Sequence, residues 1–384
     1  MKILHVCLCG PFNDNWNYQE NALVSQHKKM GFNVAVITTV HINDIKSSGY
    51  LDVAAGKYLS KEGVPIQRLQ YTKRIPRFIA SILRCYSGTY AAIDEYSPDI
   101  IFCHGLQFLD LLSVCRYMKR HPRAKLFIDC HEDLNNSAKT ILSKYILHKV
   151  LWRALAQISL KYTEVYWGTT PARMEFLVKM YDIPRSKTDL LFFGAEDSYV
   201  SLWSKDAARV SLGVSSEDFI FVSGGKIDRN KTQVLKFMRA FRKINSSVAK
   251  LIIFGSVSNE LEDEFSRNLN DRIRYIGWVE PKDTYRVFAA ADMIVFPGLH
   301  SVFWEQAVGM GIPCIFKSID GFRHVDIGGN CIFIEKDDEK YYMDLINDIL
   351  HDNNKYVAMC KSSLGPKRED FLYSKIAMKS IHYE

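Results

Sequence analysis

Short runs of apolar residues alternate with amphipathic stretches along the whole chain, and glycine or polar residues follow most of these runs. An apolar run bounded by turn residues predicts a strand buried on both faces, whereas apolar residues at three- and four-residue spacing predict a helix. The chain opens with a predicted strand over 2–8, a helix that ends at Gly31, and a strand over 33–38. A strand–helix–strand order without a hairpin signal predicts parallel strands joined by a right-handed crossover.

This order recurs in two successive halves. In the first half, later strands are predicted at 99–105, 125–133, 163–168 and 189–197, and a long apolar helix over 141–162 is expected in the core. In the second half, strands are predicted from 219 onward and at 250–255, 273–278 and 292–296. The pattern restarts after residue 197, so we expect a hinge near 195–205 and a binding cleft between the halves.

The stretch 296–315 is the most informative part of the sequence. It predicts a strand, a tight turn, and a short helix that Ser301 caps and that carries Glu305 one turn in. A helix N-terminus at the carboxyl end of a parallel strand presents free N–H groups to an anion. The Glu305 carboxylate can then accept hydrogen bonds from ribose hydroxyls, which indicates a nucleoside diphosphate site. The alternative is an ordinary β–α–β unit with Glu305 in solvent.

A second basic element follows the strand that begins at 219. Lys226 and Lys231 bracket a predicted turn, and Gly224 and Gly225 are expected to let a ligand approach the backbone. Two ammonium groups can neutralise a diphosphate. The spacing is not that of a Walker phosphate loop, and no dinucleotide-binding glycine motif follows the first strand of the chain. A solvated surface loop is the alternative interpretation.

Polar residues also follow the buried strands of the first half. His104 and Gly105 end one strand, and Asp129 and His131 end the next. Because open α/β sheets place their ligands at strand carboxyl ends, His131 is a candidate for the active cleft. A hydrogen-bonded structural histidine is the alternative.

Composition narrows these possibilities. The chain has 384 residues, 47% of them hydrophobic, and a formal net charge of +7, which suits anionic ligands and gives little support for nucleic acid. The first ten residues are too short for a signal peptide, and no run of 18 apolar residues is present. The nine cysteines show no metal-ligand spacing, so we expect reduced thiols and a cytoplasmic protein.

Taken in order, the motifs of the second half resemble those of retaining nucleotide-sugar glycosyltransferases of the GT-B fold, family 4 (glycosyl transferases group 1). The resemblance extends over nearly the whole chain and is carried by these segments: 225–231, 251–255, 275–279, 290–297, 305–313, 320–321 and 328–333. It implies an α/β protein with two Rossmann-like domains that face each other across a cleft. We expect an acceptor-binding domain over 1–197, rejoined by a C-terminal helix within 366–384, and a nucleotide-sugar-binding domain over 198–365.

The resemblance also implies roles for single residues. Glu305 matches the family's ribose-binding glutamate, Lys231 matches its diphosphate lysine, and Lys226 stands where an arginine is usual. Gly225 and Gly277 fall on the donor side, and His131 matches the histidine beside the reacting sugar. No cofactor and no metal are expected, because basic residues and a helix dipole carry the leaving diphosphate.

Two positions depart from the family pattern. Asn17, Tyr18 and Gln19 replace the glycine pair on the acceptor side, and Pro297 stands where a second glutamate contacts the transferred sugar. The nearest polar groups lead us to expect His300 opposite the sugar and the Ser301 and Val302 amides at the distal phosphate.

The implied reaction moves a sugar from a nucleoside diphosphate sugar, expected to be a UDP-sugar, to the hydroxyl of a glycan or lipid-linked acceptor with retention. The expected setting is the synthesis of bacterial surface polysaccharide or glycoconjugates. Alternatives are a nucleotide-sugar-binding module without turnover, a sugar-nucleotide epimerase and a glycoside phosphorylase. Release of UDP with and without acceptor distinguishes them.

A basic amphipathic segment lies in the first half. Pro76 suits the first turn of a helix, and Ile75, Phe78, Ile79 and Ile82 fall on one side of it, with Lys73, Arg74, Arg77 and Arg84 elsewhere. Such a helix is expected to hold the protein at an anionic membrane, at the inner face of the plasma membrane, through residues 73–84. The alternative is that its apolar side joins the core.

Overall fold

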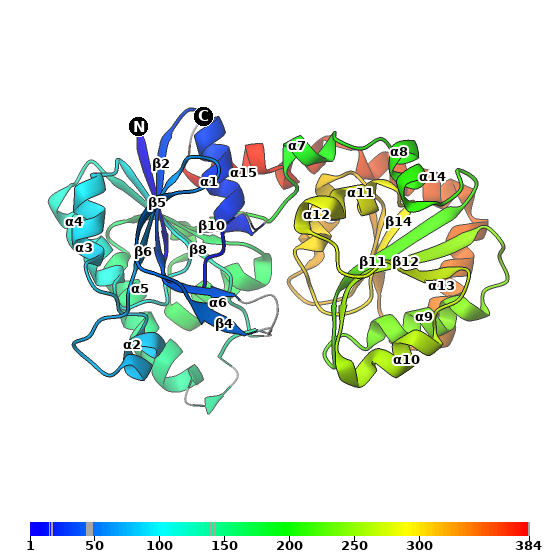
Figure 1. Cartoon of the computed structure of the whole chain (residues 1–384), viewed down its shortest axis with the longest axis horizontal. Coiled ribbons are helices and arrows are strands. Elements are labelled where there is room, and N and C mark those ends of the chain that lie inside the picture. Colours follow the sequence, from blue (N-terminus) through cyan, green and yellow to red (C-terminus); the bar gives the residue numbers. More distant parts are fainter. Residues whose placement is uncertain are drawn as a thin grey trace. The chain divides into compact units, whose positions relative to one another are not determined.

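The computed structural model describes residues 1–14, 16, 18–43, 49–134, 136–138, 140–141 and 143–382. The chain forms two compact units, unit 1 with residues 1–192 and 376–384 and unit 2 with residues 193–375 (Figure 1). The change of unit thus falls a few residues before the expected 197/198 position. The C-terminal return to unit 1 begins at residue 376, inside the segment 366–384 in which we expected it.

Unit 1 is built on an eight-stranded sheet with the order β10-β9-β8-β7-β1-β2-β6-β5. All neighbours pair in parallel except β5 and β6, which are antiparallel. Its strands are β1 Lys2–Cys7, β2 Asn33–Thr39, β5 Gly56–Leu59, β6 Pro65–Leu69, β7 Ile100–Cys103, β8 Lys125–Cys130, β9 Thr163–Gly168 and β10 Thr188–Leu190. The short strands β3 His41–Asn43 and β4 Tyr50–Asp52 form a separate antiparallel pair.

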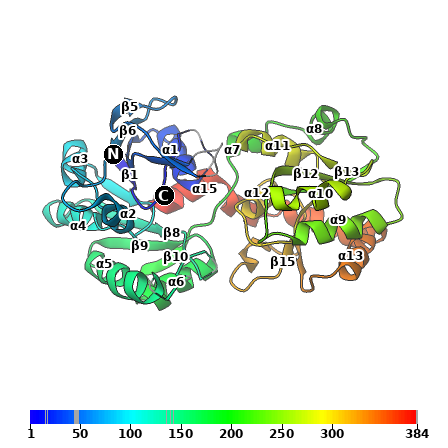
Figure 2. The same ribbon diagram turned by 60° about the horizontal axis from the view of Figure 1, so that its bottom comes forward.

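Helices cover both faces of this sheet. They are α1 Gln19–Lys29, α2 Arg77–Leu83, α3 Thr89–Tyr96, α4 Leu111–Arg120, the π-helix η1 Ser143–Trp152, α5 Arg153–Ser159, α6 Pro171–Tyr181 and the 3₁₀ turn η2 Arg185–Lys187. Figures 1 and 2 place α3 and α4 on one face, and α1 and the last helix α15 (Tyr373–Ser380) on the other. The buried core therefore lies on both sides of β1, β7 and β8.

Unit 2 repeats this plan with a six-stranded parallel sheet of order β13-β12-β11-β14-β15-β16. Its strands are β11 Phe219–Ile227, β12 Ala249–Val257, β13 Ile273–Tyr275, β14 Met293–Phe296, β15 Cys314–Lys317 and β16 Cys331–Ile334. Its helices are α7 Asp197–Val200, α8 Lys205–Leu212, α9 Gln233–Lys243, α10 Glu262–Arg267, α11 Thr284–Ala289, α12 Phe303–Gly309, α13 Glu339–His351 and α14 Asn353–Ser363. Single 3₁₀ turns are η3 Asn259–Leu261, η4 Pro281–Asp283, η5 Arg323–Val325 and η6 Pro366–Phe371.

In unit 2, α9 and α10 lie on one face of the sheet, and α8, α11 and α12 lie on the other (Figures 1 and 2). The face under α9 and α13 is filled by large apolar side chains such as Phe221, Phe237 and Phe241. The inner strands β11, β12, β14 and β15 are mostly buried, as expected for strands covered on both faces, whereas the edge strands β13 and β16 are partly exposed.

Two predictions about secondary structure were wrong. The stretch 189–197 is a strand only over β10, because the chain leaves the sheet after Leu190. The segment 141–162 is not one core helix: it contains the π-helix η1, on which Tyr145, Ile146 and Val150 are exposed. Apolar composition alone had suggested burial there.

Candidate functional site

The strand order of unit 2 reverses direction between β11 and β14. β12 and β13 continue on one side of β11, and β15 and β16 continue on the far side of β14. The loops that leave the carboxyl ends of β11 and β14 therefore diverge at this point, which is where open α/β sheets bind ligands. The first loop contains the segment 228–231, and the second contains 297–302.

These two loops touch. A side chain added at Gly298 would come within 3.5 Å of Lys231 Cγ and 3.4 Å of Gln233 Oε1. Lys231 therefore lies against the turn that precedes α12. The structure thus places the basic loop that contains Lys231 next to the turn before α12, two motifs that the sequence had predicted separately.

The two lysines differ in environment. Lys231 is half-buried, and its pKa is lowered by burial and further by the charge of Lys226, although Asp228 opposes the shift. Lys226 is exposed near the end of strand β11, with Nζ 3.9 Å from the Asp228 carboxylate. Burial and a like charge both make Lys231 less stable as a cation. A bound anion would remove that disadvantage, and this identifies Lys231 as the stronger anion-binding candidate.

The first turn of α12 is fixed by aromatic packing. Trp304 stacks on Phe316 of β15 with ring centroids 4.4 Å apart, and Phe303 lies 5.9 Å from Phe296 of β14 in a stacked orientation. The expected Ser301 cap is wrong, because Val302 occupies the N-cap position and no side chain caps the helix. The two aromatic pairs instead attach this end of α12 to strands β14 and β15.

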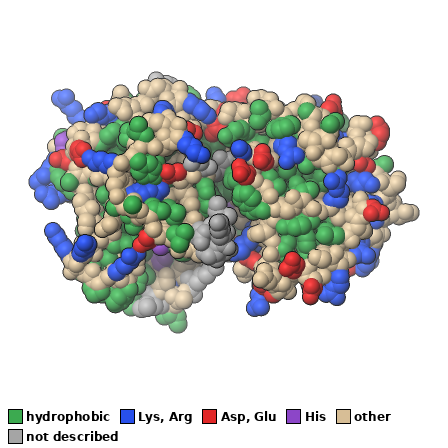
Figure 3. Space-filling model, viewed as in Figure 1, with side chains coloured by type: hydrophobic (Ala, Val, Ile, Leu, Met, Phe, Trp, Pro, Cys, Tyr) green, Lys and Arg blue, Asp and Glu red, His purple; other side chains and the backbone are tan. Residues whose placement is uncertain are grey.

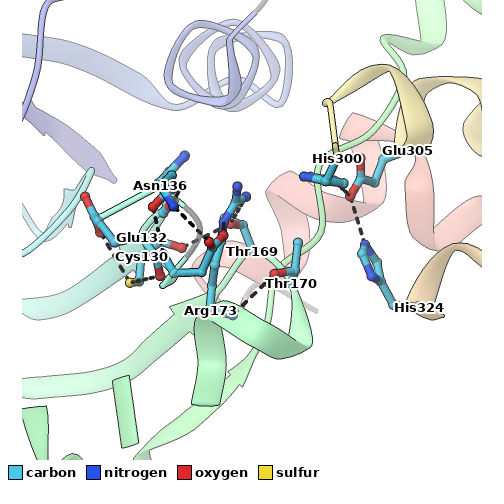
Figure 4. Close-up of polar contacts among 11 residues, drawn as sticks. Cys130, Glu132, Asn136, Thr169, Thr170, Arg173, His300, Glu305 and His324 are labelled. Atoms are coloured by element: carbon cyan, nitrogen blue, oxygen red, sulfur yellow. Dashed lines mark hydrogen bonds and ion pairs between the residues drawn. The ribbon is translucent and has the colours of Figure 1, made fainter. Parts of the chain in front are cut away.

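Glu305 lies on the inner side of α12 and is completely buried. His300 Nε2 and His324 Nε2 each lie 2.8 Å from the same oxygen, Glu305 Oε1 (Figure 4). Burial by itself would raise the pKa of Glu305, but the two imidazoles hold it well below the ordinary glutamate value. The carboxylate is therefore ionised and held by two donors from different loops.

The second oxygen, Glu305 Oε2, is also buried and has no hydrogen-bond partner among the described residues. It is an acceptor in the position where the sequence predicted a ribose contact. The carboxylate is not accessible in this conformation, so a ribose hydroxyl can reach Oε2 only after neighbouring side chains move. The ribose contact itself stays a prediction.

His300 was expected opposite the transferred sugar. Its side chain is mostly buried, with 8% exposed, and it lies 4.7 Å from the Phe322 ring in addition to its contact with Glu305. The geometry therefore gives His300 a clear role in positioning Glu305. His324 was missed by sequence reasoning, because nothing in the pattern around η5 connects it to α12.

Packing or backbone conformation explains the glycines at positions 224, 225 and 277. A side chain at Gly224 would meet the Phe254 ring at 2.4 Å, so this glycine serves the packing of β11 against β12. The interpretation that Gly224 admits a ligand is therefore wrong. Gly225 has a φ of +94°, and Gly277 has a φ of +78° and accepts a hydrogen bond from the Gly255 amide at 2.8 Å. Their donor-side roles are untested.

Unit 1 contains a comparable reversal between β1 and β7. Near the end of the next strand, β8, Asp129 is completely buried and its Oδ1 accepts a hydrogen bond from the Gly105 amide at 2.8 Å. His104 Nδ1 lies 3.1 Å and His131 Nε2 lies 3.0 Å from the other oxygen, Oδ2. One carboxylate thus holds two histidines, as Glu305 does in unit 2.

The charges of this group are coupled. Burial would raise the pKa of Asp129, but His131 and His104 lower it well below the ordinary value. Burial would lower the pKa of His131, but Asp129 outweighs it and the pKa is raised. His131 is 31% exposed at its side chain, which fits a group that can meet a ligand.

Hydrogen bonds also fix the segment after β8 (Figure 4). Asn136 Nδ2 donates to the His131 carbonyl at 2.8 Å, and Arg173 Nη1 donates to Thr169 Oγ1 at 2.9 Å. Arg173 Nε also donates to Asp133 Oδ2 at 3.2 Å. The backbone that carries His131 is therefore tied to α6 and β9.

The expected acceptor-side residues have different outcomes. Asn17 lies outside the described residues. Tyr18 is 42% exposed at the start of α1, whereas Gln19 is buried and its Nε2 lies 3.5 Å from the Phe192 carbonyl. Tyr18 is thus available to a ligand and Gln19 serves the fold of unit 1.

Within the described part of the chain, one group has three side chains of the metal-ligating kind within reach of one another: His104, Asp129 and His131. Both histidine nitrogens already contact the same Asp129 oxygen. We assign these contacts to hydrogen bonding and ion pairing and do not assign the residues as metal ligands. In the same described ranges, no helix is both long and apolar enough to cross a bilayer.

Comparison with known proteins agrees with this geometry. Residues 217–352 match the family model of glycosyl transferases group 1. The matched segment contains both lysines and α12. No curated protein matches the sequence.

Solved structures match over nearly the whole chain. Anabaena HepE in complex with UDP has a TM-score of 0.69 at 14% identity, covering 99% of this chain and 98% of that one. Sucrose-phosphate synthase from Thermosynechococcus elongatus has a TM-score of 0.68 at 16% identity, with coverage of 98% and 96%. The fold is GT-B. A putative UDP-N-acetylglucosamine 2-epimerase from Listeria monocytogenes is also similar, with a TM-score of 0.61, 12% identity and coverage of 98% and 93%. At such identities the GT-B likeness establishes two Rossmann-like domains and leaves the reaction open.

Proposed function

We propose that the protein transfers a sugar from a nucleoside diphosphate sugar, with UDP as the nucleotide, to an acceptor hydroxyl. Unit 2 binds the donor and unit 1 binds the acceptor. The single observation that carries the proposal is the contact of the Lys231 loop with the turn before α12, at the point where the unit 2 sheet reverses. It lies inside the segment that matches glycosyl transferases group 1, and the solved structure of the similar HepE contains UDP.

In this proposal the main chemical task is to stabilise the departing diphosphate. Lys231 and Lys226 supply positive charge, and the Ser301 and Val302 amides meet the distal phosphate. Hydrogen bonds to charged groups contribute about 1.5–3 kcal/mol each. Pre-positioned charges of this kind stabilise a transition state without reorganisation at the moment of reaction. We propose that no metal is needed, so turnover should be unchanged after treatment with a chelator.

The carboxylate of Glu305 is proposed to hold the ribose. His300 and His324 keep it ionised and oriented, and the buried Oε2 accepts from the ribose once neighbouring side chains move. On the unit 1 side, His131 is proposed to lie beside the reacting sugar. Retention of configuration is part of the proposal and is tested by NMR analysis of the product anomer.

A binding module without turnover is the second candidate, and one observation favours it. Pro297 occupies the position of the expected second glutamate and has no donor or acceptor side chain. An epimerase on the same fold is a third candidate. Incubating the protein with UDP-sugars and measuring UDP release, with and without acceptor, distinguishes them. A transferase releases UDP faster with acceptor than without it, an epimerase acts without an acceptor, and a binding module releases no UDP.

The nucleotide is identified first. We propose a thermal-shift panel of UDP, GDP and ADP, each at several concentrations, with the full chain. A ligand that binds only the folded protein raises the melting temperature with concentration. The proposal expects UDP to give the largest shift. Absence of a shift with every nucleotide would contradict donor binding.

We also propose contact with an anionic membrane surface, at the inner face of the plasma membrane. On α2, Phe78 and Ile82 are 67% and 51% exposed, so part of the apolar side of this helix faces away from the core, while Ile79 is half-buried. Around α2, hydrophobic and basic side chains lie side by side on the face seen in Figure 3. Helix α2 is shorter than expected, and Arg84 donates to the Gln107 carbonyl at 2.7 Å. A lipid-linked acceptor would then be reached from unit 1.

A further inference from the structure

A row of buried histidines crosses the interior of unit 1. His27 Nε2 lies 3.0 Å from the Ala377 carbonyl oxygen, and His27 Nδ1 lies 3.0 Å from His5 Nε2. His5 Nδ1 lies 3.0 Å from His104 Nε2, and His104 Nδ1 lies 3.1 Å from Asp129 Oδ2. The row therefore runs from α15 through α1 and β1 to the end of β7, and ends at the carboxylate that also contacts His131.

The whole row is buried. His5, His27 and Asp129 are completely buried, and His104 is 7% exposed. A buried acceptor that faces another acceptor, with no hydrogen between them, loses its hydration without gaining a hydrogen bond. Each of the four contacts must therefore contain a hydrogen.

The hydrogens can be counted. The row has four contacts, between Ala377 and His27, His27 and His5, His5 and His104, and His104 and Asp129. Both ends are acceptors, because a carbonyl has no hydrogen and an ionised carboxylate has none. A neutral imidazole carries one N–H group, so three neutral rings supply three hydrogens for four contacts.

Ser380 does not supply the fourth hydrogen. Its Oγ lies 3.2 Å from His27 Nε2, but it donates to the Ala377 carbonyl at 2.8 Å. If the hydroxyl donated to His27 Nε2 instead, that nitrogen and the Ala377 oxygen would face each other at 3.0 Å as two acceptors. The hydroxyl oxygen therefore accepts a share of the His27 N–H. The row needs one proton more than its neutral rings carry.

We infer that His104 is an imidazolium that donates from both ring nitrogens, and that His5 and His27 are positioning residues that hold this proton beside Asp129 and thereby set the charge state of His131. Only a ring in contact with the carboxylate gains an opposite charge within hydrogen-bond distance, and His104 is that ring. The inference rests on the proposed function only for its kinetic consequence.

Other properties of the row agree with this assignment. Burial lowers the pKa of His5 well below its ordinary value, and the charges of His27 and His104 lower it further. Burial lowers the pKa of His27 to about 4, although the Ala377 carbonyl opposes the shift. Both rings are therefore neutral, which leaves the extra proton on His104.

The surroundings contain few other charges. The groups that interact with Asp129 and His131 from neighbouring elements are Glu20 of α1, Arg173 of α6 and three thiols, those of Cys7, Cys9 and Cys103. Burial raises the pKa of all three thiols well above the ordinary value, so they are neutral. Glu20 raises and Arg173 lowers the pKa of His131.

The consequence for His131 follows from charge balance. His131 and His104 share one oxygen of Asp129, so a positive His104 offsets the carboxylate that stabilises protonated His131. Removing the charge of His104 should leave Asp129 uncompensated. The pKa of His131 should then rise.

The test is ¹⁵N NMR of the full-length protein labelled at its histidines, prepared with a chelator. The signal of His104 is assigned by its loss in His104→Gln. We expect both His104 ring nitrogens to be of the protonated type from pH 6 through pH 8, and we expect the His131 titration to move to higher pH in His104→Gln. A His104 with one unprotonated nitrogen at pH 7, or an unchanged His131 titration, would overturn the inference.

A matched pair of variants tests the role of the row. Glutamine at position 27 can donate to Ala377 and accept from His5, so His27→Gln keeps the hydrogen count, whereas His27→Leu removes two contacts and one hydrogen, and with them the need for the extra proton. His104 should lose its proton at lower pH in His27→Leu than in His27→Gln. Equal titration of His104 in the two folded variants would contradict the proposed role of the row. If His27→Leu does not fold, the wild type and His104→Gln still decide the question.

A kinetic measurement separates this inference from the proposed function. If His131 acts in turnover, the limb of the pH–rate profile that it controls should move to higher pH in His104→Gln, together with the NMR titration. If the His131 titration shifts in His104→Gln and the rate profile does not, the extra proton on His104 is supported and His131 is excluded from the proposed site.

Discussion

Trp304 and Phe316 lie parallel, with ring centroids 4.4 Å apart and planes 1° from each other. Trp304 is the second residue of α12, and Phe316 belongs to the neighbouring strand β15, so the pair attaches the helix to the sheet. Both side chains are completely buried. The position of Glu305, one residue later on the helix, depends on this attachment.

The first prediction concerns this pair. Trp304→Ala should lower the free energy of unfolding by about 3–5 kcal/mol, the usual cost of removing a large buried aromatic side chain. Trp304→Phe keeps a stacking ring and should cost less. Urea denaturation followed by far-UV circular dichroism measures both. Equal losses in the two variants would show that stacking on Phe316 contributes nothing specific.

The second prediction concerns pH and Glu305. Its pKa in the folded state lies well below the unfolded value of about 4.3, so the ionised form is favoured by folding. This contribution is complete above the unfolded pKa and is lost as the pH falls toward the folded pKa. The free energy of unfolding should therefore fall more steeply in the wild type than in Glu305→Gln as the pH falls below about 4.3 toward the folded pKa.

A control for this experiment is Glu217→Gln, because Glu217 is exposed at the start of unit 2's sheet. This variant should retain the pH dependence of the wild type. Parallel curves for the wild type and Glu305→Gln would contradict the ionised, histidine-bound Glu305.

The third prediction concerns glycine packing. Gly224→Ala should destabilise the protein by about 1–3 kcal/mol, because the new methyl group would meet the Phe254 ring at 2.4 Å. Gly10→Ala is the matched control, since a side chain there would have nothing within 4 Å. Thermal unfolding of both variants tests this. A stable Gly224→Ala protein would restore the interpretation that this glycine serves a ligand.

The fourth prediction concerns the membrane. Phe78→Ser with Ile82→Ser should reduce flotation with anionic liposomes, because both side chains are exposed and inserting them would bury apolar surface in the lipid interface. Lys73→Gln with Arg74→Gln should reduce flotation at low salt, by about 1 kcal/mol per charge. Arg84 is left unchanged because it bonds to Gln107.

A control for flotation is Val210→Ser, which replaces a 78% exposed apolar residue of unit 2. It should float as the wild type does. Unchanged flotation of the Phe78 and Ile82 variant would contradict membrane contact through α2.

Much of the fold could be predicted from the sequence, because short apolar strands that end in glycine or polar residues have few other structures. The strands at 2–8, 33–38 and 250–255 match β1, β2 and β12 closely. The stretch 189–197 was misjudged because Leu191 and Phe193 are buried outside any strand. Burial follows apolar character, whereas strand formation also needs a neighbour to pair with.

The site was predictable only in part. Lys231 and Glu305 were found because each follows a buried strand at a characteristic distance. His324 and His5 were not, because their roles come from contacts between segments far apart in the sequence. A histidine within an apolar strand, such as His5, is the one local signal that could have indicated a buried polar network.

The central claim is that Lys231 binds the diphosphate of the donor in unit 2, and titration calorimetry with UDP tests it most directly. Lys231→Ala should weaken UDP binding about tenfold or more, which corresponds to about 1.4 kcal/mol. Lys243→Ala removes a lysine from the opposite end of α9, where it pairs with Glu339 at 2.7 Å, and should bind UDP as the wild type does. Equal affinity of Lys231→Ala and the wild type for UDP would contradict the account.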